Sequence, residues 1–123
     1  MTTKHLLEAL PIHIHIMGEF YTGKVYINGR LLRPDDSLKI RNHSPDGFKW
    51  GYGGSGPAQF ALALMLLYVD VETAQRYYQD LKFGYLAGLP QRDINLHVNL
   101  RWVVAKILEL GPFMAVKQTI HAI

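Results

Sequence analysis

The chain has 123 residues, of which 49% are hydrophobic and 19% charged, so its size and composition are those of one ordinary globular domain rather than a multidomain protein. It contains no cysteine, which excludes disulfides, thiol catalysis and cysteine-based zinc sites. The formal net charge of +3 is small for a dedicated nucleic-acid-binding domain. All of that excess lies within residues 24–49, where six Lys and Arg side chains oppose three Asp side chains.

The N-terminal segment gives no sign of a targeting signal. Residues 1–16 lack the basic start, apolar block and cleavage site of a signal peptide, and no run of about 20 apolar residues is present to cross a membrane. We therefore expect a cytoplasmic protein with no membrane partner. The second methionine, Met17, leaves open that residues 1–16 are an N-terminal extension, in which polar–apolar alternation predicts a strand over residues 12–16.

Residues 24–51 predict a small antiparallel sheet of about four strands. Asn28-Gly29 is a strong signal for a two-residue turn, and it predicts a hairpin with strands at 24–28 and 30–33. Polar and apolar residues alternate again in Ser37–Arg41 and before the glycines in Gly47–Trp50, which predicts two further strands.

Three helices are expected after this sheet. Pro57 suits the first position of a helix over residues 57–69, in which every residue after Gln59 is apolar, so this helix should be surrounded by other elements. Asp70 is a good N-cap for a second helix over residues 71–87. A third helix is expected over residues 99–110, before the C-terminal tail.

The predicted fold class is therefore α+β: the small antiparallel sheet packs on the buried helix, with two further helices beside it. Residues 17–110 are expected to form this single domain, and residues 111–123 a C-terminal tail. The alternation within residues 93–98 is ambiguous and suggests another short strand.

The glycine run Gly51–Gly56 is the most distinctive local feature. It matches G-x-G-x-x-G between a predicted strand and a predicted helix. A dinucleotide-binding unit also needs a second parallel strand ending in an acidic residue, but Asp70, at nearly the right distance, caps a helix. A P-loop is excluded because neither Lys nor a hydroxyl residue follows Gly56. Two interpretations stay open: a tight turn that allows close packing, or an anion site at a helix start.

The segment around the glycines carries a family resemblance. Residues 44–63, SPDGFKWGYGGSGPAQFALA, closely resemble the central motif of the domain of unknown function 6166 family, which comprises small bacterial, plasmid and phage proteins. The resemblance extends from about Tyr21 to about Leu110, with Leu81 where the family tends to have Phe. It implies a compact single domain and a mobile-element context. The family has no established activity, so the resemblance supplies no catalytic residues.

The candidate ligand-binding residues combine the basic strand surface with the glycine turn. The set is Arg41, His43, Lys49, Tyr52, Gly53, Gly54, Ser55, Gly56 and Gln59. No catalytic residue and no cofactor is predicted, because His43, Ser44 and Asp46 lie too close together in one turn to form a hydrolase relay.

The sequence predicts no metal site, although one alternative stays open. The alternative is His13 with His15, which share one face of the predicted N-terminal strand and would chelate a metal if a third ligand such as His97 came near.

The sequence thus favours a small non-catalytic binding protein whose ligand is anionic, namely a nucleotide, a phosphate or a nucleic-acid backbone. One alternative is a protein-binding accessory or inhibitor of a mobile element, whose partner would be another protein. A second alternative is an enzyme acting on a nucleotide with His43 as acid or base. The enzyme is disfavoured because no carboxylate pair, metal cluster or activated nucleophile is evident.

Overall fold

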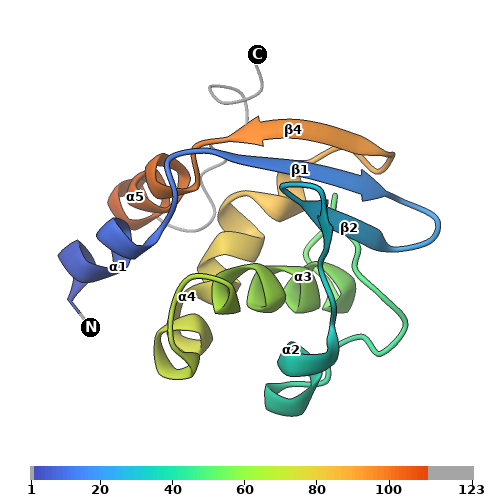
Figure 1. Ribbon diagram of the computed structural model, residues 1–123, viewed down its shortest axis with the longest axis horizontal. Coiled ribbons are helices and arrows are strands. Elements are labelled where there is room, and N and C mark those ends of the chain that lie inside the picture. The colour runs from blue at the N-terminus through green and yellow to red at the C-terminus, as the bar shows by residue number, and fades with distance from the viewer. Residues whose placement is uncertain (1, 111–123) are drawn as a thin grey trace.

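The structure, a computed structural model, describes residues 2–110, and the predicted tail lies outside these residues. Helices and strands are mixed along the chain in the order that Figure 1 shows. The elements are α1 (Thr3–Ala9), β1 (Ile14–Glu19), β2 (Lys24–Ile27), β3 (Arg30–Leu31), α2 (Asp35–Ile40), α3 (Ser55–Leu66), α4 (Val71–Gly84), the short 3₁₀ helix η1 (Leu86–Gly88), β4 (Ile94–Val98) and α5 (Leu100–Leu110).

The four strands form one antiparallel sheet in the order β3-β2-β1-β4. The sheet lies as a layer on top of α3 and α4 (Figure 1), and alternate residues of β1, such as Ile14 and Ile16, face these helices and are fully buried. The α+β fold class is confirmed. The composition of the sheet is not as predicted, because β1 and β4 come from outside residues 24–51. In the described chain, no helix is both long and apolar enough to cross a membrane.

The predicted hairpin is confirmed. Asn28 and Gly29 both have positive φ angles, 52° and 81°, as a two-residue type I′ turn requires. The side-chain oxygen of Asn28 accepts a hydrogen bond from the backbone N–H of His15 at 2.9 Å, which fastens the turn to β1. The flanking strands are shorter than expected because β3 comprises Arg30–Leu31 alone.

Residues 37–41, predicted as a strand, instead belong to helix α2 and its C-terminal end. The local reason is the preceding sequence. Asp35 and Asp36 occupy the first turn, where carboxylates interact favourably with the positive end of a helix, and Lys39 lies in the last turn. The half-buried apolar side chains of this segment are Leu38 and Ile40, two positions apart. Alternation over only five residues therefore does not distinguish a strand from a short helix.

Residues 47–50 also do not join the sheet. Their alternation is as predicted, with Phe48 and Trp50 buried and Lys49 half-buried between them. Single backbone hydrogen bonds hold the ends of this segment, from Phe48 N–H to the Gly23 carbonyl at 3.2 Å and from Gly51 N–H to the Leu86 carbonyl at 2.9 Å. The segment is fixed by burial of its aromatic rings and not by a strand ladder.

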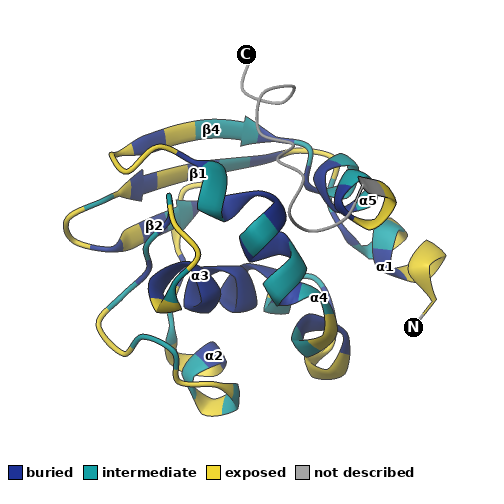
Figure 2. Ribbon diagram, turned by 180° about the vertical axis from the view of Figure 1, so that it is seen from behind, coloured by how far each residue is buried: buried dark blue, intermediate teal, exposed yellow. Residues whose placement is uncertain are grey.

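Helix α3 is enclosed as predicted. It begins at Ser55, two residues before the expected start, and every residue from Gly56 to Met65 is buried. Figure 2 shows this helix in the colour of buried residues along most of its length. The predicted cap of the next helix is also confirmed, because the Asp70 carboxylate accepts a hydrogen bond from Thr73 N–H at 2.8 Å.

The N-terminal residues are built into the same core. Leu6 and Leu10 are fully buried, and the Leu10 carbonyl accepts a hydrogen bond from the Arg101 side chain at 3.0 Å. Strand β1 is central, paired with β2 on one side and β4 on the other. Residues 3–16, set apart in the sequence as an extension, thus supply one helix and the first half of a central strand.

A chain that starts at Met17 is predicted to lose cooperative folding. This chain would lack Ile14 and His15, which pair with Val98 and His97 of β4, so part of the β1–β4 pairing would be lost. The measurement is thermal unfolding by circular dichroism, which should give no sharp transition. A melting temperature within a few degrees of that of the full chain would contradict the role given to residues 3–16.

Point variants test whether the N-terminal residues stabilise the protein through their burial in the core. Leu10→Ala should lower the free energy of unfolding by about 2–4 kcal/mol, as expected for a leucine that is removed from a packed core. Ile12→Ala is the matched control, because Ile12 is 61% exposed, and it should change this free energy by less than about 0.5 kcal/mol.

Candidate functional site

The candidate site lies at the N-terminus of α3, where the glycine run ends. Gly54 is the N-cap and has no side chain to accept a backbone N–H. The first amide to find a backbone acceptor is that of Ala58, which donates to the Gly54 carbonyl at 3.1 Å. Pro57 has no N–H, so the amides of Ser55 and Gly56 are those that the helix itself leaves without an acceptor.

Three of the glycines are in close contact with neighbouring side chains. A Cβ atom on Gly53 would lie 3.1 Å from the Phe83 ring, and one on Gly56 would lie 2.6 Å from Lys49 Cβ. A Cβ atom on Gly54 would lie 2.5 Å from the ring of Tyr52. Close packing is therefore a sufficient reason for glycine at Gly56, where the neighbouring atom is Lys49 Cβ, whereas the exposed Tyr52 ring beside Gly54 is free to turn away.

Gln59 has a structural task inside the protein. Its side chain is fully buried, and its Oε1 atom accepts the backbone N–H groups of His43 at 2.7 Å and Ser44 at 3.1 Å. Its Nε2 atom donates to Ser37 Oγ at 2.8 Å, and that hydroxyl donates to the Pro34 carbonyl. This amide group thus fastens α2 and the following loop to α3, and it is not presented to a ligand as the sequence suggested.

Lys49 is also engaged within the protein. Its ammonium donates to the Phe20 carbonyl and lies 4.3 Å from the centre of the Phe20 ring, while its alkyl chain packs on Gly56. Two other members of the predicted set, Arg41 and Tyr52, are exposed.

His43 lies where the loop after α2 meets α4. Its ring is half-buried, and its Nε2 atom is 2.8 Å from the hydroxyl of Tyr78, a hydrogen-bond distance. Burial, then the positive charges of Lys82 and Arg41, lower the pKa of His43 from its ordinary value. The ring is therefore mainly neutral at pH 7 in the free protein.

Lys82 is the residue that sequence reasoning missed. It is only 6% exposed, although such a lysine is expected on a solvated helix face. Its ammonium lies 3.9 Å from the centre of the Phe83 ring, and burial lowers its pKa. One sequence signal was present: Lys82 follows Tyr78 by four residues and so lies on the same, inward face of α4.

In the part of the chain that the structure describes, no carboxylate forms an ion pair with Arg41, His43 or Lys82. The ion pairs among the described residues lie elsewhere and are Lys4–Glu8, Arg33–Asp35, Lys39–Asp36 and Lys106–Glu109. Within the same residues, the Lys82 ammonium has neither an ion pair nor a hydrogen bond. Three residues before Lys82 on α4, Gln79 Oε1 is buried and has no hydrogen-bond partner among residues 2–110.

The three histidines of the metal alternative do come together, but as a stack. His15 pairs with His97 across β1 and β4, and their rings are 4.6 Å apart and nearly parallel. His13 stacks on the same ring at 5.2 Å, with its Nε2 atom 3.1 Å from His97 Nδ1. His15 Nε2 is bonded to the Asn95 side chain. Between residues 2 and 110, no three His, Cys, Asp or Glu side chains are arranged to hold a metal ion.

A comparison with protein families matches residues 17–106 to DUF6166, a family of unknown function. The chain belongs to this family. The match begins within β1 and includes α3, α4 and the loop with His43, so the whole candidate site lies inside the family domain. No curated protein and no solved structure matches the chain.

Loss of the Gln59 side chain is predicted to destabilise the protein strongly. Gln59→Ala would leave two partly buried backbone N–H groups and the Ser37 hydroxyl without their partner and would create a cavity, at a cost of about 3 kcal/mol or more. Urea denaturation checks this value. Gln91→Ala, at an exposed residue that makes one hydrogen bond, to the Gly51 carbonyl, should cost less than about 1 kcal/mol. Equal losses for both variants would contradict the role assigned to Gln59.

Proposed function

We propose that this DUF6166 domain is a cytoplasmic, non-catalytic binding protein whose ligand carries an anionic oxygen group, such as a phosphate. The ligand is held by Lys82 and His43 beside the first amides of α3. The observation that carries the proposal is the buried Lys82 ammonium, which has no counter-ion among the described residues. Burial of a charge is costly unless an opposite charge or hydrogen bonds compensate it, and a bound anion supplies both.

Contacts on both sides of Lys82 connect it to the rest of the site. On one side its ammonium lies on the Phe83 ring, which packs against Gly53 of the glycine turn. On the other side its charge acts on His43, whose ring nitrogen is bonded to the Tyr78 hydroxyl one helical turn before Lys82. An anion beside Lys82 would therefore also be close to the start of α3, where unpaired N–H groups favour negative charge.

The donors of this site suit a phosphate and offer little for catalysis. The ammonium and the helix amides donate hydrogen bonds, and the His43 ring and the Tyr78 hydroxyl add two further polar groups. Among the described residues, the side-chain partner of the His43 ring is the Tyr78 hydroxyl, and no carboxylate is paired with a histidine as in a hydrolase relay. Binding without turnover is thus the function that this arrangement supports best.

Phosphate binding should depend on Lys82. We expect inorganic phosphate, and AMP as a nucleotide probe, to shift the amide NMR signals of residues 53–56 and 82–83 in the full chain. Lys82→Met should weaken the binding of both by about tenfold or more, because it removes the buried positive charge. Lys24→Met is the control, since Lys24 is an exposed lysine on β2, and it should bind like the parent protein.

The stability of the same variant separates binding from folding. Lys82→Met should unfold at the same or a higher temperature than the parent protein, because an apolar side chain replaces a buried charge. Unchanged phosphate binding by a folded Lys82→Met protein would overturn the proposal. The proposal would also be overturned if the parent protein bound neither phosphate nor AMP and if denaturing the purified protein released no nucleotide. A protein-binding accessory or inhibitor of a mobile element would then be the better interpretation.

The pKa of His43 should report the bound anion. In the free protein this pKa is lowered, so the unfolded state binds the proton more readily than the folded state. As the pH falls from about 6.5 through the folded-state pKa, His43 therefore lowers the free energy of unfolding. Added phosphate brings negative charge to the ring and should raise its pKa, as measured by NMR of the imidazole signals. His5, exposed on α1, should not respond, and a His43 pKa unchanged at saturating phosphate would contradict the proposal.

A further inference from the structure

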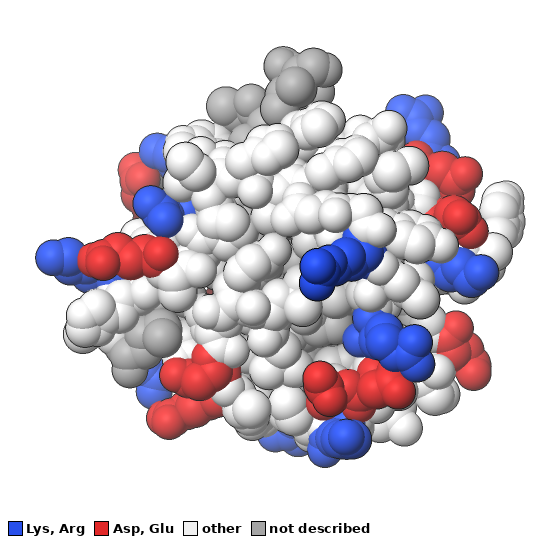
Figure 3. All heavy atoms as spheres, viewed as in Figure 1, with Lys and Arg blue, Asp and Glu red and all other residues white. Residues whose placement is uncertain are grey.

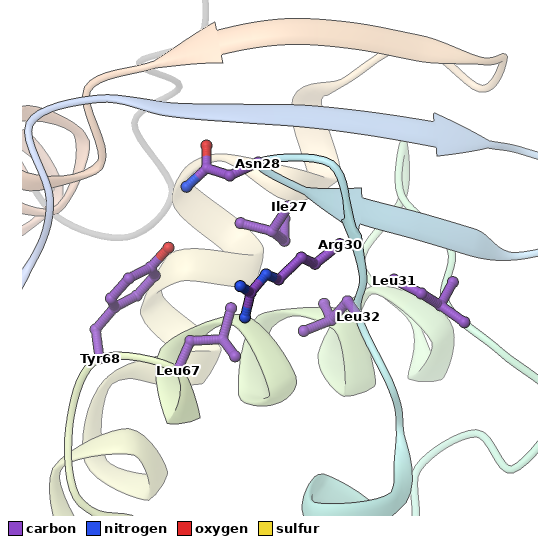
Figure 4. Close-up of a pocket in the computed structure, with 7 residues that line it drawn as sticks. All are labelled: Ile27, Asn28, Arg30, Leu31, Leu32, Leu67 and Tyr68. Carbon is purple, nitrogen blue, oxygen red and sulfur yellow. The ribbon is translucent and has the colours of Figure 1, made fainter.

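A second concave surface lies near the opposite end of α3. It is a pocket of about 420 Å³ between the β2–β3 hairpin and the residues that follow α3. Because α3 has 12 residues, this pocket is about 18 Å along the helix from the proposed anion site. Figure 4 shows the residues that line it, which are Ile27, Asn28, Arg30, Leu31, Leu32, Leu67 and Tyr68.

The lining of this pocket is mostly apolar and is partly exposed to solvent. Leu31 and Leu67, on opposite sides, are 45% and 50% exposed, although each is a large aliphatic side chain. Ile27 and Leu32 are buried behind them. Single exposed leucines are common on protein surfaces, but two that share one concave surface with a buried apolar floor form the kind of lining that ligand pockets use.

The polar groups of the pocket include a cation without an acid. Arg30 extends across the pocket between Leu32 and Tyr68 (Figure 4), and it has no ion pair among the described residues. The neighbouring Arg33 does have one, with Asp35 at 3.5 Å. On the face that Figure 3 shows, one basic group near the middle stands apart from the acidic groups, whereas other basic groups lie beside them.

The other two polar side chains add hydrogen-bond donors. The carbonyl oxygen of the Asn28 side chain is taken by His15 N–H, which leaves its NH₂ group as a donor. The Tyr68 hydroxyl points toward Asn28 across the pocket (Figure 4), and burial raises the pKa of Tyr68, so the phenol keeps its proton. Guanidinium, amide and phenol groups together match the oxygens of a carboxylate, which a guanidinium binds through two parallel hydrogen bonds.

We infer that this pocket binds a small amphipathic carboxylate, with its carboxylate on Arg30 and its apolar chain or ring on Leu31, Leu32 and Leu67. The inference is independent of the anion site at Lys82. That site offers an ammonium and the start of a helix to a charged group, whereas this pocket offers one guanidinium beside apolar side chains. Neither feature alone identifies the ligand class, but their combination requires a molecule with one anionic end and one apolar end.

The test uses octanoate as the probe and 1-octanol as its uncharged counterpart. Octanoate should shift the NMR signals of Ile27, Leu67 and Tyr68, and octanol should bind about tenfold more weakly or not at all. Arg30→Gln should weaken octanoate binding by about tenfold and leave the weak octanol binding unchanged. Octyl phosphate distinguishes the anionic groups, and it should bind no more tightly than octanoate.

Two matched variants complete the test. Arg33→Gln removes the adjacent arginine, which does not line the pocket, and it should bind octanoate like the parent protein. Leu67→Glu places a negative charge at a half-exposed position and should prevent octanoate binding in a folded protein. Equal binding of octanoate and octanol, unchanged binding by Arg30→Gln, or shifts confined to other surfaces would each overturn the inference. Lys82→Met should still bind octanoate, so failure of one site is distinguishable from failure of the other.

Discussion

The arrangement around α3 depends on one constraint: a polar side chain that is buried within an enclosed helix must find hydrogen-bond partners. Gln59 is the polar side chain buried within that helix, and its amide group is satisfied by the chain on either side of residue 40. Those hydrogen bonds fix α2 and the loop after it, and the fixed loop brings His43 to Tyr78. The geometry of the candidate site therefore follows from a requirement of the core.

Features with a complete local cause could be predicted from the sequence. The turn at Asn28-Gly29, the cap at Asp70 and the enclosed helix each follow from a few consecutive residues, and the structure contains all three. Strand pairing has no such local cause. Alternation in Gly47–Trp50 correctly indicated which side chains are buried, but it carried no information about whether a partner strand lies beside them. Two of the predicted strands therefore lie outside the sheet.

The candidate site divides in the same way. Residue types and spacing located the start of α3 and its glycines, because a strand-to-helix turn is a local event. They did not indicate that the ammonium of Lys49 would turn to the Phe20 carbonyl, nor that Lys82 would be buried beside His43. Both depend on contacts between residues about 30 to 40 positions apart, and such contacts arise from packing of whole elements rather than from any short motif.

The central position of β1 has a consequence for how the protein folds. Its partner β4 lies about 80 residues further along the chain, as the pairing of His15 with His97 shows. Closing so long a loop costs conformational entropy before the β1–β4 contacts form and compensate for it. Folding is therefore slower than in a protein built from local contacts. During synthesis the hairpin and the α3–α4 pair can form while one edge of β1 is still unpaired. The sheet is completed only after the ribosome has released β4.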